Sequence, residues 1–331
     1  MDRAYIDNKH PVSCCIVPSI ECFLKCKMCY LWKSRPEPDR IRLNEWESFI
    51  DSLDTALSDR RELIFSGGEP LLNQDIAHLI NYGDKRGLKA TLSTNAFLID
   101  EDMAKQMIEA GLKEIYISLD SFNEETHDFL RGVDGSHKKA MNAIDYLNKY
   151  RRKLKINIIT VISQCNLLEI VKLAKEMCAE NKIDGIYFQA ISQPFYTPFD
   201  EYWYKKKEYS FLWPADPKTV SLVIDELISL KKQNCSIINH VRHLEKFKSY
   251  FDSPDTYVTK SRCYLGNYTI NVNPAGDIFL CCFMDPVGSI RKDNINELWF
   301  SEKAQQRREE MYQCRRNCHN MVNCFFMEKE E

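Results

Sequence analysis

The chain has 331 residues, with 45 Lys and Arg against 48 Asp and Glu, so its formal net charge is −3. This balance provides no strong basic field and argues against a nucleic-acid partner. Hydrophobic residues make up 44 % and charged residues 28 %, which excludes wholesale disorder. No apolar run approaches the roughly 18 residues of a membrane span, and the polar N-terminus has no signal peptide. We therefore expect a cytoplasmic protein with no membrane partner.

Six short apolar runs alternate with helical segments in the first half of the chain. Strands are expected over residues 13–20, 62–66, 89–93, 114–120, 155–163 and 185–191. Helices are expected over residues 43–57, 75–87, 100–111, 137–150 and 167–181. This order predicts parallel strands with right-handed crossovers. Six units are too few for an eight-stranded barrel, so we predict an α/β fold, a partial (β/α)6 TIM-like barrel, with its active site at the carboxyl ends of the strands.

The alternation ends after residue 191. Residues 193–217 are rich in aromatic residues and proline, which is typical of either a packed linker or a lid that faces the substrate. Helices are then expected over 217–232 and 240–252, followed by a hairpin over 267–282 and a cysteine-rich end. We predict three parts: a barrel over 1–191, a linker and helical segment over 192–255, and a small α+β domain over 256–331.

The 14 cysteines are unevenly distributed. Five lie within residues 14–29 and six within 263–324, whereas the residues between hold only Cys165, Cys178 and Cys235. In a reducing cytoplasm, clustered cysteines more often bind metal or perform redox chemistry than form disulfides. The two clusters therefore predict two metal sites, and buried apolar cysteine is sufficient to explain the three scattered ones.

Cys22, Cys26 and Cys29 form a C-x3-C-x2-C motif just after the first predicted strand. Three thiolates on one tight loop can hold three corners of a [4Fe–4S] cluster and leave the fourth iron open for a substrate or cofactor. A zinc site needs a fourth nearby ligand, and the only histidine close by, His10, precedes the strand. The motif favours an iron–sulfur cluster over zinc.

This motif at the start of a partial barrel resembles the radical S-adenosylmethionine (SAM) superfamily, and the resemblance covers roughly residues 11–191. Gly67, Gly68, Glu69 and Pro70 agree with it, because a GGEP loop follows the second strand in that family and hydrogen-bonds the amino group of SAM. Adjacent glycines let backbone approach a ligand closely, and a carboxylate suits an ammonium group. The resemblance implies a [4Fe–4S] cluster with SAM at its open iron.

Polar residues at the ends of later strands complete the expected SAM site. The resemblance implies that Ser118 and Arg131 hold the SAM carboxylate, which a guanidinium matches bidentately. The alternative for Arg131 is a surface charge at a helix end. Further candidates for SAM binding are Ser93, Asn95, Gln189 and Tyr30, the last beside the position where the family often has an aromatic residue and this chain has Met28.

The second cysteine group resembles the SPASM extension or its shortened form, Twitch, which bind auxiliary iron–sulfur clusters. The matching cysteines are Cys263, Cys281, Cys314, Cys318 and Cys324. The later cysteines of SPASM are missing, so the resemblance implies one auxiliary [4Fe–4S] cluster held by Cys263, Cys281 and two of the last three. Cys282 is a further candidate, because neighbouring side chains on a strand point to opposite faces. A structural zinc site is the alternative.

The resemblance implies an enzyme that reductively cleaves SAM to a 5′-deoxyadenosyl radical and abstracts a hydrogen atom from a substrate C–H bond. The expected reaction is oxidation or epimerisation of a sugar-like or other small molecule, since only 21 residues precede Cys22 and leave no room for a peptide-recognition domain there. A maturase or epimerase of ribosomally made peptides is the alternative, and a non-catalytic zinc-binding protein a further one. An electron donor such as flavodoxin or ferredoxin is the expected partner.

Cys165 lies in the sequence ISQCN, just beyond the fifth predicted strand. A thiol at this end of the barrel can donate a hydrogen atom to a substrate radical, as an epimerase requires. A half-buried cysteine packed at a strand-to-helix turn is the alternative.

Overall fold

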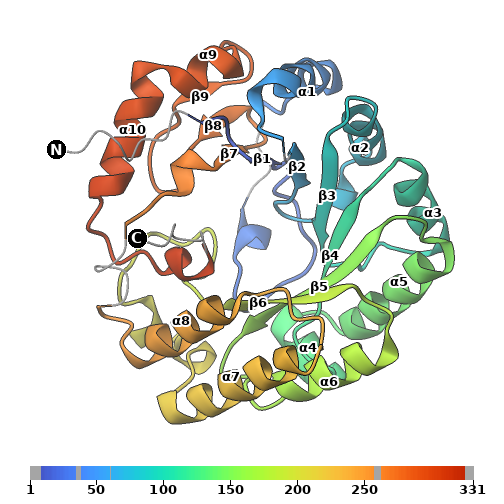
Figure 1. Ribbon diagram of the computed structural model, residues 1–331, viewed down its shortest axis with the longest axis vertical. Coiled ribbons are helices and arrows are strands. Elements are labelled where there is room, and N and C mark those ends of the chain that lie inside the picture. Colours follow the sequence, from blue (N-terminus) through green and yellow to red (C-terminus); the bar gives the residue numbers. More distant parts are fainter. Residues whose placement is uncertain (1–8, 35–38, 60, 257–261, 325–331) are drawn as a thin grey trace.

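A computed structural model describes residues 9–34, 39–59, 61–256 and 262–324 (Figure 1). The strands form one nine-stranded sheet in the order β6-β5-β4-β3-β2-β1-β7-β8-β9. The six predicted strands are found and pair in parallel. They are β1 Ser13–Ile16, β2 Glu62–Phe65, β3 Lys89–Thr94, β4 Glu114–Ser118, β5 Lys155–Ile162 and β6 Gly185–Ala190. The predicted partial barrel is thus confirmed.

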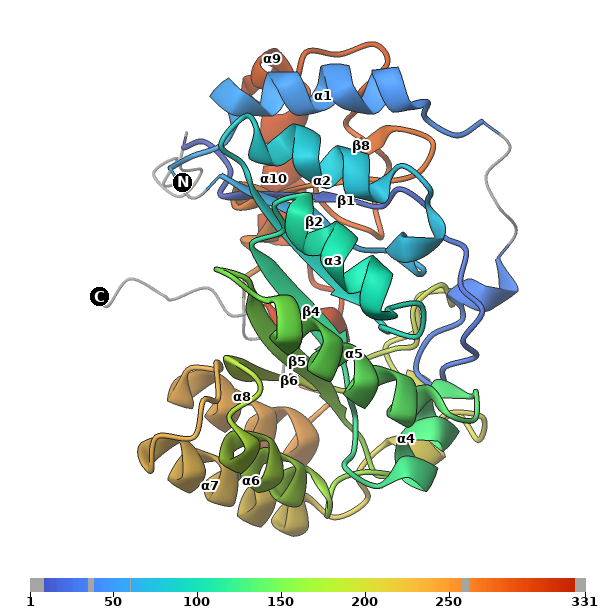
Figure 2. The same cartoon turned by 90° about the vertical axis from the view of Figure 1, so that its right-hand side faces the viewer.

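Helices cover the outer side of these strands, as Figure 2 shows. They are α1 Leu43–Ala56, α2 Ile76–Asp84, α3 Glu101–Glu109, α4 Glu124–Arg131, α5 Ser136–Tyr150 and α6 Ile170–Glu180. The sequence pattern does not predict α4, because this helix is short and its residues, EETHDFLR, are mostly polar. Asn123 caps its start and Gly132, in the left-handed region with φ 69°, ends it. Within the described ranges, no helix is long and apolar enough to span a membrane.

The segment after β6 packs as a linker and two helices, α7 Pro217–Lys232 and α8 Val241–Asp252. The side chains of Trp203 and Tyr204 are buried, and Trp213 stacks on Tyr204 with ring centroids 4.7 Å apart. This part of the aromatic segment is therefore a packed linker. Phe195 and Tyr196, at its start, are more than half exposed.

Hydrogen bonds from three distant parts of the chain cover the outer edge of β6. Residues 236–238 pair with Ile186 through the backbone. The side-chain amide of Asn239 bonds both the N–H and the C=O of Phe188, at 2.7 and 2.8 Å. The amide of Asn323 does the same for Ala190, at 2.9 Å for each bond. These bonds give partners to backbone N–H and C=O groups that an edge strand would otherwise leave unpaired.

The predicted C-terminal hairpin is found, but its strands join the barrel sheet. β7 Thr269–Val272, β8 Asp277–Phe279 and β9 Gly288–Ser289 lie beyond β1, as Figure 1 shows. β7 pairs in parallel with β1, starting with Ser13 opposite Thr269. The helices α9 Ile295–Phe300 and α10 Glu302–Gln313 follow. The C-terminal part therefore continues the first strand of the barrel.

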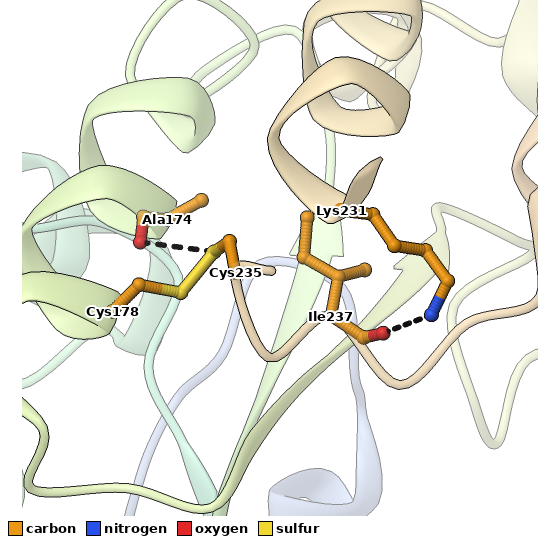
Figure 3. The surroundings of a disulfide bond; sticks show 5 residues. All are labelled: Ala174, Cys178, Lys231, Cys235 and Ile237. Atoms are coloured by element: carbon orange, nitrogen blue, oxygen red, sulfur yellow. Dashed lines mark hydrogen bonds between the residues drawn. A yellow bond between two sulfur atoms is a disulfide. The ribbon is translucent and has the colours of Figure 1, made fainter. Parts of the chain in front are cut away.

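Cys178 and Cys235, two of the three scattered cysteines, form a disulfide. Figure 3 shows this bond between α6 and the segment that follows α7. Cys235 directly precedes residues 236–238, which pair with Ile186 near the start of β6. The disulfide therefore fixes the segment that covers this part of the strand edge.

Candidate active site

A cavity of about 190 Å³ lies at the carboxyl ends of the barrel strands, where the sequence predicts the active site. Residues at the ends of β2 to β6 and on the loop after β1 line it. Those singled out by the sequence are Cys22, Cys26, Cys29, Gly67, Gly68, Ser93, Asn95, Ser118, Arg131 and Gln189. The fold thus brings three thiols, a glycine loop, an arginine and several small polar groups around one space.

The cysteine loop is held by backbone hydrogen bonds to the end of α4. The N–H groups of Lys25 and Lys27 donate to the carbonyls of Arg131 and Leu130 at the end of α4, at 3.1 and 2.8 Å. A Cβ on Gly132 would lie 2.3 Å from the carbonyl oxygen of Lys25, so this close approach needs glycine. The end of α4 therefore fixes the loop at the cavity wall.

The three thiols fit a cluster ligand set. Burial raises the pKa of Cys22 to about 12 and that of Cys29 to about 11, so the metal-free thiols hold their protons. Cluster binding must displace these protons, because the thiolate is the ligand. Among the residues that the structure describes, no three Cys, His, Asp or Glu side chains are grouped as ligands of a single metal ion.

The glycine loop packs against the chain that leads into the cysteine loop. The N–H of Gly68 donates to Ser19 O at 3.1 Å, and the N–H of Glu69 donates to Glu21 O at 2.7 Å. A Cβ on Gly68 would lie 2.2 Å from Glu21 O. The glycine is thus required by the approach of two backbone segments, in addition to the ligand approach that the sequence predicts.

Glu69 is fully buried beneath the cavity. Its carboxylate accepts hydrogen bonds from Thr94 Oγ1 at 2.7 Å, Asn95 N at 2.8 Å and Leu71 N at 3.1 Å. Burial raises the pKa of this carboxyl to about 7, against the lowering effect of these bonds. All three donors are neutral, so a cationic group in the cavity would stabilise the charged form.

Arg131 forms a buried ion pair with Asp120. Its Nε lies 2.7 Å from Asp120 Oδ2, and the two side chains are 10 % and 0 % exposed. Asp120 Oδ1 also accepts a hydrogen bond from Val161 N at 3.0 Å. Arg131 is therefore no surface charge: it reaches the cavity wall beside Ser118 and is held there by a carboxylate that the sequence analysis does not predict as a site residue.

The second cysteine group gathers beside the end of α10. Burial raises the pKa of both Cys318 and Cys324 to about 12, and the charges of Cys263 and Cys281 add to this rise. The charges of Cys281 and Cys314 likewise raise the pKa of Cys263, after burial. Cys263 is thus an electrostatic neighbour of the other four thiols, although their sequence positions run from Cys263 to Cys324.

Comparison with known proteins agrees with both sites. The profile of the Radical SAM superfamily matches residues 16–176, and that of SPASM, an iron–sulfur cluster-binding domain, matches residues 263–324. The chain carries a radical SAM domain followed by a SPASM domain. The radical SAM domain implies SAM and a [4Fe–4S] cluster, and the SPASM domain implies auxiliary iron–sulfur clusters.

Individual relatives share parts of this organisation. An AdoMet-dependent heme synthase of Methanosarcina barkeri is 35 % identical over 48 % of this chain and 45 % of its own length. A PqqA peptide cyclase of Granulibacter bethesdensis is 21 % identical over 86 % of this chain and 73 % of its own length. The first relatives are thus matched over less than half of their length.

Solved structures share the fold. SuiB of Streptococcus suis bound to S-adenosylmethionine has a TM-score of 0.69 and 19 % identity, over 90 % of this chain and 68 % of SuiB. SuiB has also been solved bound to the precursor peptide SuiA. At this identity the likeness shows the fold alone.

Four residues singled out by the sequence are not among those that line the cavity: Glu69, which is fully buried, and Tyr30, Pro70 and Cys165. Tyr30 packs against Tyr209, with ring centroids 5.8 Å apart. Pro70 is buried at the start of a short 3-10 helix, Pro70–Leu72. Cys165 is half-buried, and its thiol donates to Phe211 O at 3.6 Å.

Two aromatic residues of the lining were missed by the sequence analysis. Trp32 follows the cysteine motif by three residues, and Phe195 begins the aromatic segment after β6. Phe195 forms a parallel bridge with Cys29, and the N–H of Tyr30 donates to Phe195 O at 3.0 Å. The only signal for them is aromatic character near a motif and near a strand end, which packing also explains.

Proposed function

We propose that this chain is a radical SAM enzyme that removes a hydrogen atom from a C–H bond of a peptide substrate. The observation that supports the reaction class is the convergence of three thiols and Arg131 on one cavity, with the buried carboxylate of Glu69 bonded to the lining residues Thr94 and Asn95. The three thiols would hold the first cluster, and Cys263, Cys281 and two of Cys314, Cys318 and Cys324 would hold one auxiliary [4Fe–4S] cluster. Flavodoxin or ferredoxin is the proposed electron donor.

Two residues of opposite charge would bind the two charged groups of the methionine part of SAM. The carboxylate of Glu69 lies beneath the cavity floor and complements an ammonium group. The guanidinium of Arg131, held by Asp120, complements a carboxylate beside Ser118. When bound, the cluster and SAM supply a 5′-deoxyadenosyl radical, and the apolar side chains of Ile159 and Val161 keep water from that part of the cavity.

The rim of the cavity supports a peptide as the substrate. A space of about 190 Å³ is below the usual size of a ligand pocket, about 300–1,000 Å³, and the cofactor occupies it first. We therefore propose that the substrate lies across the rim. Phe195 lines the cavity and is 55 % exposed, and its chain neighbour Tyr196 is 58 % exposed. Exposed aromatic side chains of this kind mark recognition surfaces. The PqqA peptide cyclase is a relative over most of this chain.

A small molecule is the second candidate substrate, in line with the expectation of sugar-like oxidation or epimerisation. The AdoMet-dependent heme synthase supports it, because the identity to this chain is higher there, at 35 %, although over a shorter stretch. Mass analysis of products decides between them. Co-expression with a short open reading frame beside the gene yields a peptide of altered mass if the substrate is a peptide.

The reaction class is tested with protein reconstituted without oxygen. We expect about eight irons, from two clusters of four, and formation of 5′-deoxyadenosine from SAM and dithionite. Replacement of Cys22, Cys26 and Cys29 together by Ala removes about four irons and abolishes 5′-deoxyadenosine. Replacement of Cys263 instead removes up to four irons and spares the first cluster. SAM cleavage by the triple variant, or colourless protein that binds zinc, would contradict the proposal.

A further inference from the structure

The C-terminal end of β6 connects the two cysteine groups. Ala190 is the last residue of β6, and both of its outward backbone groups bond the side-chain amide of Asn323 at 2.9 Å. Asn323 directly precedes Cys324, a ligand candidate of the SPASM domain. Five residues after Ala190, Phe195 forms a bridge with Cys29 of the first cysteine loop. A short path of backbone thus runs between the two sites.

The same piece of strand forms part of the cavity wall. Gln189 and Phe195, on either side of Ala190, both line the cavity. Residues 189 and 190 also pair with β5 on the inner side of the strand. The Asn323 amide therefore bonds the outer edge of the strand end whose residue Gln189 lines the cavity.

The support depends on an ordered cysteine tail. Residues 319–323 form one short 3-10 helix, and the tail is held by bonds from His243 Nε2 to Val322 O at 2.9 Å and from Tyr187 Oη to Asn323 O at 3.3 Å. Metal binding orders the segments next to its ligands, because ligand deprotonation, binding and local folding are coupled. Filling the auxiliary site therefore fixes Asn323 in its bonding position.

We propose that Asn323 is a positioning residue that couples occupancy of the auxiliary cysteine site to SAM binding, through Ala190 and the Gln189 wall. The proposal rests on the proposed function, since it requires both cofactors. Asn239 provides a control on the same strand. Its amide makes the same pair of bonds to Phe188, and it belongs to the loop before α8 and not to the cysteine tail. Its amide nitrogen also lies 3.2 Å from Nδ1 of His243, whose Nε2 contacts Val322 O, so its link to the tail runs through His243 and not through Ala190.

A double-mutant cycle on SAM affinity tests the coupling. In otherwise unchanged protein, Cys263→Ala weakens SAM binding about tenfold, within the usual range of coupling between sites. In an Asn323→Ala background, Cys263→Ala has less than about a twofold effect, because the connection is already cut. In an Asn239→Ala background the effect of Cys263→Ala persists. A purely structural role of Asn323 would lower stability in both backgrounds and leave the effects additive, which would overturn the proposal.

Hydrogen exchange gives a readout that needs neither SAM nor activity. In the variant that lacks Cys22, Cys26 and Cys29, reconstitution fills only the auxiliary site. We expect the Ala190 amide, which donates to Asn323, to exchange at least about tenfold more slowly after reconstitution, and to lose this protection in Asn323→Ala. Equal exchange before and after iron uptake overturns the inference. If the unaltered protein binds iron but no SAM, the proposed function fails instead.

Discussion

Glu69 makes the stability of the metal-free protein depend on pH in an unusual direction. Its pKa is about 7 in the folded chain and near its ordinary value of 4.5 in the unfolded chain. The folded state therefore holds a proton that the unfolded state has lost, and this contribution to stability is present below pH 4.5 and disappears as the pH rises through 7. At about 1.4 kcal/mol per pH unit between the two values, the loss approaches about 3 kcal/mol.

We predict that Glu69→Gln removes this pH dependence, since the amide cannot ionise. Urea unfolding of the metal-free protein at pH 5 and pH 8 measures it. The unaltered chain should lose more stability than the variant between these values. Equal losses of unfolding free energy in the two proteins would contradict a raised pKa of the buried Glu69 carboxyl. The variant should also bind SAM more weakly, because the ammonium group loses its carboxylate partner.

Asp120 is predicted to be costly to remove. Asp120→Ala leaves the guanidinium of Arg131 buried without its carboxylate, at a cost of about 3–5 kcal/mol. Asp102 serves as the control, because its side chain is 94 % exposed and pairs only with Lys105 at 3.5 Å. Asp102→Ala should change stability by less than about 0.5 kcal/mol. Similar melting temperatures for both variants would show that the buried pair contributes little.

Single residues of the candidate site were predictable where the chemistry depends on residue type. Thiols at a fixed spacing and the sequence Gly67 to Pro70 indicate a cluster and a cofactor loop by themselves. The partnership of Arg131 with Asp120 was not predictable, because it depends on α4, a short polar helix without apolar periodicity. The contact of the Tyr30 ring with Tyr209 was not predictable either, because it joins the cysteine loop to the aromatic segment after β6.

At the level of elements, the glycine loop and the cysteine loop form one packed unit. Gly68→Ala forces a Cβ against the backbone of Glu21, which cannot move without shifting the cysteine loop. We predict a loss of about 3 kcal/mol, at the upper end of overpacking, together with reduced iron uptake at the first site. Chemical unfolding and iron analysis measure both.

Gly135→Ala is the matched control for this prediction. A Cβ there meets nothing within 4 Å, so only the left-handed backbone with φ 78° opposes the change. The expected loss is about 1 kcal/mol, with normal iron uptake. If both variants take up iron alike, the two loops are not coupled as described.

Elements were predictable where one local pattern decides them. The six barrel strands are short apolar runs followed by helices, and all six are found. The disulfide between Cys178 and Cys235 was not predicted, because it depends on α6 and the end of α7 lying side by side, which no local pattern encodes. The same reason hides the Asn239 and Asn323 amides, whose partners lie 51 and 133 residues away.

For the whole molecule, the C-terminal part covers both edges of the barrel sheet. β7 pairs with β1 at one edge, and Asn323 bonds β6 at the other. The hairpin itself was predictable from its turn, but its pairing with a strand 256 residues earlier was not. The SPASM region is thus a structural part of the radical SAM barrel.

Truncation tests this arrangement. A chain that ends at residue 255 loses β7 and Asn323 together and exposes unpaired backbone on β1 and β6. We predict self-association, because open sheet edges pair with one another. Size-exclusion chromatography with light scattering compares it with the full chain. A monomeric truncated chain with the melting temperature of the full chain would show that the edges do not need this cover.

The pairing of β1 with β7 also sets an order of events during translation. β2 follows β1 by about 50 residues and pairs with it, but the other neighbour of β1 is synthesised only at Thr269–Val272. Through most of synthesis the nascent barrel therefore exposes an open parallel edge. This edge stays open until β7 is made, and the cysteines of the auxiliary site, Cys263 to Cys324, are synthesised in the same part of the chain, so closure of the edge and filling of the auxiliary site become possible at about the same time.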